Sequence, residues 1–88
     1  MKDKVFKFYE SSSHGWYAVK RKYIEELGVL NKISECSFQH GGTVYLEEDG
    51  DALAFFEAYE KKFGSPPKIS TKDFNCEPPC TRYERFSP

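Results

Sequence analysis

Two short segments of the chain combine side chains that could bind a partner molecule. In the first, His14, Trp16 and Tyr17 follow three serines and enclose a glycine, which gives a flexible loop with an imidazole and two aromatic rings. Loops on a rigid scaffold often carry binding residues. Trp16 could instead close the edge of the hydrophobic core, and the sequence favours neither interpretation over the other.

The second candidate binding segment lies near the end of the sequence, where arginines alternate with aromatic residues. Its candidate residues are Arg82, Tyr83, Arg85 and Phe86. Arginine and tyrosine are enriched in the residues that dominate protein interfaces. The same side chains can also hold phosphates or stack on nucleobases.

Residues for catalysis follow no pattern that we can assign to a reaction. No serine lies in the context of a nucleophile elbow, and no glycine-rich segment leads from a strand into a helix as phosphate binding requires. Cys36 falls in a predicted strand, where a buried thiol is expected, and no base is marked beside it. We therefore expect no catalytic residue and a protein that is not an enzyme, with a small hydrolase or metalloprotein as the third choice.

The three cysteines are an odd number, which argues against a scaffold built on disulfides. Cys76 and Cys80 flank Glu77-Pro78-Pro79, but a zinc site needs two further ligands and the two histidines are distant in the sequence. We expect three free thiols, no bound metal and no cofactor.

Four acids gather in the segment Glu47-Glu48-Asp49-Gly50-Asp51. A calcium loop needs oxygen ligands at alternate positions over about a dozen residues, whereas these acids lead directly into an apolar helical pattern. Capping of that helix by Asp49 or Asp51 is the favoured interpretation. The alternative is a site for a divalent cation or a basic partner.

Charge is segregated along the chain although the net charge is only −1. Residues 1–22 carry six Lys and Arg against two acids, residues 23–60 nine acids against one lysine, and residues 61–88 six Lys and Arg against three acids. The overall balance is too neutral for an obvious nucleic-acid binder or a polyanion mimic. A small nucleic-acid contact module that uses the basic ends remains the alternative function.

Apolar spacing predicts the main elements. Alternation indicates strands over 4–9, 16–19 and 68–74. Helical spacing covers 20–27 and recurs from Ala52 to Phe63, and glycines at 28 and 64 end the two helices.

The clearest pattern is a hairpin over 34–48. A three-residue loop at 40–42 places Phe38 opposite Val44, and further along Cys36 opposite Leu46 and Glu35 opposite Glu47. A two-residue Gly41-Gly42 loop would put Phe38 and Val44 on different faces, because a slip of one residue reverses every side chain. We therefore predict the three-residue loop, with Thr43 and Tyr45 facing away from the core. The predicted shared core is Phe38, Val44, Leu46, Phe56 and Tyr59.

Together these elements predict a single α+β domain over residues 1–88. A small antiparallel sheet, centred on the hairpin 34–48, is covered on one face by two helices. The segment 75–88 is a candidate for a loosely ordered C-terminal tail. No apolar run approaches a membrane span, and no basic start leads into a hydrophobic signal segment. We expect a cytoplasmic protein without membrane contact.

The sequence resembles a group of small uncharacterised proteins encoded by phages and mobile elements. The resemblance covers residues 11–60 and rests on His14-Gly15-Trp16, Leu27-Gly28-Val29, Lys32-Ile33-Ser34, the run Thr43 to Asp49, Asp51-Ala52 and Phe56. It brings no activity and no catalytic residue. It implies an accessory protein in the cytoplasm of a bacterial host that modifies or blocks host machinery.

We therefore predict a non-catalytic binding protein that occupies the surface of a host or phage protein, as a modulator or inhibitor of a host enzyme or defence complex. Eight Phe, six Tyr and one Trp exceed what one small core can absorb, and exposed rings favour binding. Contacts between two copies in a homodimer are a further alternative for the exposed aromatic residues.

Overall fold

Six strands, two α-helices and one short 3₁₀ helix make up the computed structural model, which describes residues 4–11, 14–73 and 82–88. The elements are β1 (Val5–Glu10), β2 (Gly15–Lys20), α1 (Arg21–Glu26), the 3₁₀ helix (Leu30–Lys32), β3 (Phe38–His40), β4 (Thr43–Glu47), α2 (Asp51–Phe63), β5 (Lys68–Asp73) and β6 (Glu84–Arg85). No helix within these described ranges is long and apolar enough to cross a membrane.

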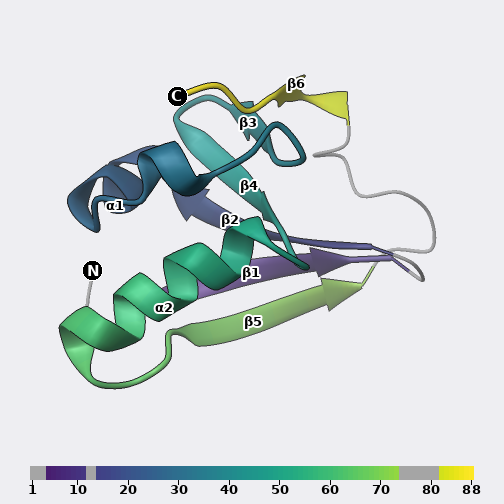
Figure 1. The fold of residues 1–88 in the computed structure, drawn as a ribbon. Helices are drawn as coiled ribbons and strands as arrows, with labels where there is room; N and C mark the ends of the chain where they lie inside the picture. Colours follow the sequence, from purple (N-terminus) through teal and green to yellow (C-terminus); the bar gives the residue numbers. More distant parts are fainter. Residues whose placement is uncertain (1–3, 12–13, 74–81) are drawn as a thin grey trace.

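All six strands belong to one sheet in the order β5-β1-β2-β4-β3-β6. In Figure 1 they follow one another from β5 at the bottom to β6 at the top, with α2 in front of the sheet. The predicted α+β class with two helices is confirmed. The sheet is mostly antiparallel, but β5 runs parallel to β1, and β2 and β4 rather than the β3–β4 hairpin form its middle pair.

Local sequence explains where the helices end. Gly28 follows α1 with φ 73°, and Gly64 follows α2 with φ 80°, a left-handed conformation that residues with a Cβ rarely adopt. The Gly64 N–H donates to the Glu60 carbonyl at 2.7 Å, which completes the last turn of α2. The predicted ends of both helices are therefore confirmed.

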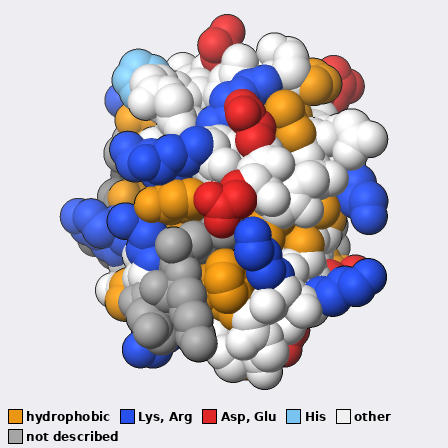
Figure 2. Space-filling model, turned by 90° about the vertical axis from the view of Figure 1, so that its left-hand side faces the viewer, with side chains coloured by type: hydrophobic (Ala, Val, Ile, Leu, Met, Phe, Trp, Pro, Cys, Tyr) orange, Lys and Arg blue, Asp and Glu red, His pale blue; other side chains and the backbone are white. Residues whose placement is uncertain are grey.

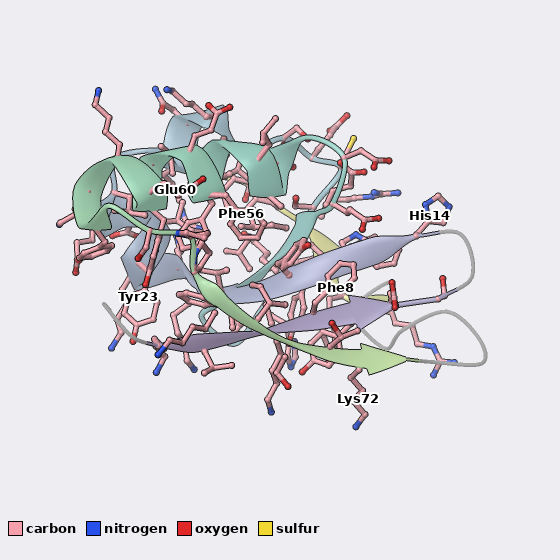
Figure 3. All side chains as sticks on the ribbon, turned by 90° about the horizontal axis from the view of Figure 1, so that it is seen from below. Phe8, His14, Tyr23, Phe56, Glu60 and Lys72 are labelled. Carbon is pink, nitrogen blue, oxygen red and sulfur yellow. The ribbon has the colours of Figure 1, made fainter. Side chains whose placement is uncertain are left out.

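The main core joins the sheet to both helices. Ile24 of α1 and Phe55 of α2 are completely buried and pack in the same cluster. Sheet residues of this cluster include Phe6, Val19, Val44 and Leu46. Tyr59 of α2 and Phe86 near the C-terminus also belong to it, together with Val29, Ile33 and Ala52. Figure 3 shows Phe56 between α2 and the sheet, where it packs against the main core as predicted.

The predicted hairpin register is wrong. His40 pairs with Thr43 and Phe38 with Tyr45, so the loop has only two residues, Gly41 and Gly42, with φ of 54° and 80°. Two successive positive φ values are those of a type I′ turn, which matches the twist of paired strands. Phe38 therefore lies on the face opposite Val44. It is buried there with Trp16, next to Tyr45 and Tyr83, instead of joining the main core.

The expected positions of Cys36 and Glu35 are also wrong. Both precede β3 in a turn, the Cys36 thiol is exposed, and Glu35 has no strand partner. Ser37 takes the buried position instead, because its hydroxyl accepts a hydrogen bond from the Glu47 N–H at 2.9 Å. Cys76 and Cys80 lie outside the described residues.

Asp51 does not cap α2, and neither does Asp49. The N-cap residue is Gly50, which has no side chain to accept a hydrogen bond. Asp51 is buried in the first turn, where its carboxylate accepts hydrogen bonds from Ser34 Oγ at 2.8 Å and Ser37 Oγ at 2.5 Å. The acid therefore ties the turn before β3 to the start of α2.

The last residues of the chain are held against β3. β6 pairs with β3, and the Phe86 N–H donates to the Ser37 carbonyl at 2.9 Å. Arg21 of α1 donates to the Ser87 carbonyl at 3.0 Å. Within the candidate tail 75–88, the residues from Tyr83 to Ser87 thus have defined partners, whereas 75–81 lie outside the described part.

Candidate functional site

The sheet has a second face, defined here as the face opposite the main core. Side chains alternate along a strand, so Phe6 and Phe8 of β1 face the main core while Val5, Lys7 and Tyr9 face the other way. The registers extend this face across the sheet. Its further members are Trp16, Ala18 and Lys20 of β2, Thr43, Tyr45 and Glu47 of β4, Phe38 and His40 of β3, Lys68, Ser70 and Lys72 of β5, and Arg85 of β6.

The parallel pairing of β1 with β5 brings both basic ends of the sequence onto this second face. Lys68 lies beside Val5, and Lys72 beside Tyr9. Figure 3 shows Lys72 directed away from α2. Figure 2 views the molecule from the end that lies at the left of Figure 1. On the left of this view, Lys and Arg side chains gather among hydrophobic ones.

A groove of about 340 Å³ opens on the second face, and Phe6 and Tyr23 from the main-core side also line it. We call it the basic groove, because Lys4, Lys7 and Lys20 line it together with Tyr9 and Tyr45. No Asp or Glu is among the described residues that line it. The side chains of Lys7 and Lys20 make no ion pair with any described residue. The basic groove is therefore a site of positive potential.

Ala18 explains why the surface is hollow at this point. It lies in the middle of β2, with Lys7 of β1 on one side and Tyr45 of β4 on the other. Opposed residues on neighbouring strands have Cβ atoms about 5 Å apart. A methyl group between two long side chains leaves space above it, and Ala18 is one of the residues that line the groove.

Aromatic rings continue from the basic groove across the second face. The Tyr9 and Tyr45 ring centroids are 6.1 Å apart, and the Tyr45 and Tyr83 centroids 5.2 Å apart. Tyr83 stacks on His40 with centroids 4.3 Å apart and an angle of 11° between the planes. We call these four residues the aromatic row. It runs across the strands and offers polarisable faces next to positive charge.

Trp16 belongs to the second face but contributes little surface. Only 6% of it is exposed, and its ring lies against Phe38 and His14 at 6.0 and 5.8 Å. The Arg85 guanidinium lies over the Phe38 ring at 4.7 Å. The buried Trp16 Nε1 has no hydrogen-bond partner in the described part of the molecule. Trp16 thus packs at the edge of a core, one of the two interpretations open from the sequence.

Tyr17 lies on the face opposite Trp16, because the two are neighbours in one strand. Its ring contacts Phe8 and Phe56 at 4.3 and 4.7 Å. Burial raises the pKa of the Tyr17 phenol, and the negative charges of Glu48 and Glu10 raise it further. The predicted set of His14, Trp16 and Tyr17 is therefore divided between two faces, with His14 exposed at the start of β2.

The second predicted segment is divided in the same way. Phe86 is buried in the main core, with the Arg21 guanidinium 5.5 Å from its ring. Tyr83 joins the aromatic row, and Arg85 and Arg82 are exposed. From this segment the structure brings Tyr83 and Arg85, but not Phe86, to the second face.

Sequence reasoning missed the residues that form the basic groove. Lys7, Lys20, Tyr9 and Tyr45 were not candidates, because only strand pairing brings them together around Ala18. The charge excess of the two ends was the available signal. It carried no information on the face to which those charges point.

The described residues contain no group of three or more His, Cys, Asp or Glu side chains that could hold a metal ion. Comparison of the chain with protein-family models, with curated proteins and with solved structures finds no match. We therefore infer the function from the geometry of the second face.

Proposed function

We propose that the protein binds single-stranded nucleic acid on the second face of its sheet. The observation that carries the proposal is the parallel pairing of β1 and β5, which collects lysines of both basic ends beside the aromatic row. This function is the alternative that the basic ends suggested from the sequence.

The proposal requires that the helices cover one face and leave the other accessible. Ile24 of α1 and Phe55 of α2 support this arrangement, because both pack with Val19 and Leu46 on the main-core side. Lys7, Lys20 and Lys72 on the opposite side are exposed.

Lysines of the basic groove would hold the phosphates. A Lys ammonium is a compact charge on a flexible stem and binds phosphate without a fixed geometry. Neutralised phosphates release counterions, which drives binding and makes it weaken as salt increases. No Asp or Glu is among the described residues that line the groove, so none of these residues competes with a phosphate for the lysines.

The aromatic row would hold the bases. Each base stacked on an aromatic side chain contributes about 1–3 kcal/mol to binding, with little dependence on sequence. Stacking of this kind needs bases that are not paired, because bases in a duplex already stack on one another. The combination therefore favours a single strand over a duplex.

Binding to a host or phage protein remains a prediction from the sequence, as do the cytoplasmic location and the phage context. The candidate contacts for that function are spread over two faces, with Tyr17 and Phe86 directed into the main core. The geometry gives this function, and a homodimer through the same residues, less support than nucleic-acid binding.

The proposal is tested by the salt dependence of binding to short fluorescent strands of DNA and RNA, with a duplex for comparison. Replacing Lys7 and Lys20 together by Gln removes two charges from the basic groove. Because each phosphate contact contributes about 0.7 to the slope of log K against log salt, we expect the slope to fall by about 1.4.

The matched control replaces Lys32 and Lys61 by Gln, which removes two charges from a different hollow, between α2 and the segment after α1. We expect this variant to bind single strands like the wild type. Equal losses in the two double variants, or a wild type that binds no strand at low salt, would contradict the proposal.

A further inference from the structure

We infer that the basic groove seats one unpaired base with its phosphate, and that Ala18 determines which bases enter. This inference rests on the proposed function and adds to it a defined subsite and a residue that sets its selectivity. The ligand class is a single nucleotide unit within a longer strand.

The size of the basic groove limits its occupant. Sites for small ligands have volumes of about 300–1,000 Å³, and the groove, at about 340 Å³, lies at the lower end of this range. It can therefore take one unit of a strand, and the neighbouring bases must lie elsewhere on the aromatic row.

The position of that unit follows from the two tyrosines. Tyr9 and Tyr45 already contact one another as an aromatic pair, with planes inclined at 44° and centroids 6.1 Å apart. This leaves no space for a base between them. The depression above Ala18 is the remaining place where a flat ring can contact both tyrosines.

Two lysines lie close to the place that the phosphate of the bound nucleotide would occupy. Lys7 is the cross-strand neighbour of Ala18, and Lys20 lies two residues further along β2 on the same face. Both side chains are exposed and line the groove. A base above Ala18 thus brings its own phosphate within reach of both ammonium groups.

The depression above Ala18, here called the seat, is open because the side chain of Ala18 is only a methyl group. A larger residue at this position fills the depression from below. It leaves the main core unchanged, because Ala18 points to the opposite face. The charges of the groove also remain, so loss of the seat can be separated from loss of the phosphate contacts.

The test measures affinity for a fluorescent single strand with Ala18→Leu and with Ala54→Leu as its control. Ala54 of α2 lines the separate hollow that also contains Lys32 and Lys61, and it lies outside the second face. We expect Ala18→Leu to weaken binding about tenfold, in line with one lost base stack, with an unchanged salt slope. Ala54→Leu is expected to bind like the wild type.

A second variant, Ala18→Val, allows the inference to be tested even if Ala18→Leu disturbs folding. Valine is favoured in strands and fills the seat only in part. We expect it to weaken binding of a purine strand more than that of a pyrimidine strand, because the larger bases lose their space first. Both variants are checked by thermal unfolding.

The two proposals fail in different ways. If Ala18→Leu and Ala18→Val bind both strands like the wild type while Lys7→Gln with Lys20→Gln still weakens binding, the seat does not exist and the proposed function stands. If the folded wild type binds neither strand, both are wrong.

Discussion

The hydroxyl of Ser37 is a small group on which the start of α2 depends. It donates to the buried Asp51 carboxylate and accepts from the Glu47 N–H. Removing it leaves two buried polar groups short of a partner, which costs about 1–3 kcal/mol. We expect Ser37→Ala to lower the free energy of unfolding by this amount, measured with denaturant. A loss no larger than that of the exposed Ser70→Ala would contradict the assigned role.

Tyr17 makes the free energy of unfolding depend on pH in the alkaline range. Its pKa is raised by burial and then by Glu48 and Glu10, so the folded state favours the neutral phenol. The stabilisation is complete below the ordinary tyrosine pKa of about 10 and is lost as the pH rises above it, because the unfolded chain ionises first. The urea concentration at the midpoint of unfolding is therefore expected to decrease as the pH is raised from about 9 to about 11.

The control for this pH effect is Tyr17→Phe, which has no phenol to ionise. We expect the fall in the unfolding midpoint to be smaller in this variant than in the wild type. In a Tyr23→Phe variant, which leaves Tyr17 in place, the unfolding midpoint should fall as much as in the wild type. The same alkaline loss in Tyr17→Phe would show that another group is responsible.

At the level of the strands, Gly15 of β2 leaves space for the Phe8 ring of β1. A Cβ at this position would collide with Cζ and Cε1 of the Phe8 ring, which is itself buried. Overpacking of this kind costs about 1–3 kcal/mol, so Gly15→Ala should lower the unfolding free energy by that much. Gly50→Ala is the control, because its Cβ would meet only Glu47 Oε2, at 3.7 Å. Similar losses in the two variants would exclude the collision as the cause.

The strands and helices could be predicted because their signals are local. Apolar alternation gave β1 and β2, and Gly28 and Gly64 gave the ends of the helices. The hairpin register could not be predicted, because the choice of loop assumed a single apolar face. Phe38 is accommodated on the second face by Trp16 and its neighbours, so the Gly41-Gly42 turn exposes no apolar side chain there.

At the scale of the whole molecule, net charge was a poor guide to the electrostatics. The acidic middle of the sequence supplies exposed acids of α1 and α2, such as Glu25 and Glu57, whereas β1, β2 and β5 place lysines on the second face. A chain that is neutral overall can therefore present a basic surface, and local potential governs the approach of a charged ligand.

The candidate site could be predicted only in part, for the same reason. The sequence drew attention to the two basic ends and to Tyr83 and Arg85, which lie on the second face. It could not reveal the basic groove, because Lys7 and Tyr45 come together only through the strand order β1-β2-β4. Long-range pairing, and not residue type, creates the surface.

Chemical-shift mapping by NMR shows directly whether a single strand lies on the second face. Labelled protein is titrated with a short single strand, and the amide signals are followed residue by residue. We expect the largest shifts at Lys7, Ala18 and Tyr45, with little change at Leu53 and Lys61 on α2. Shifts confined to α2, or no shift at any residue at low salt, would contradict it.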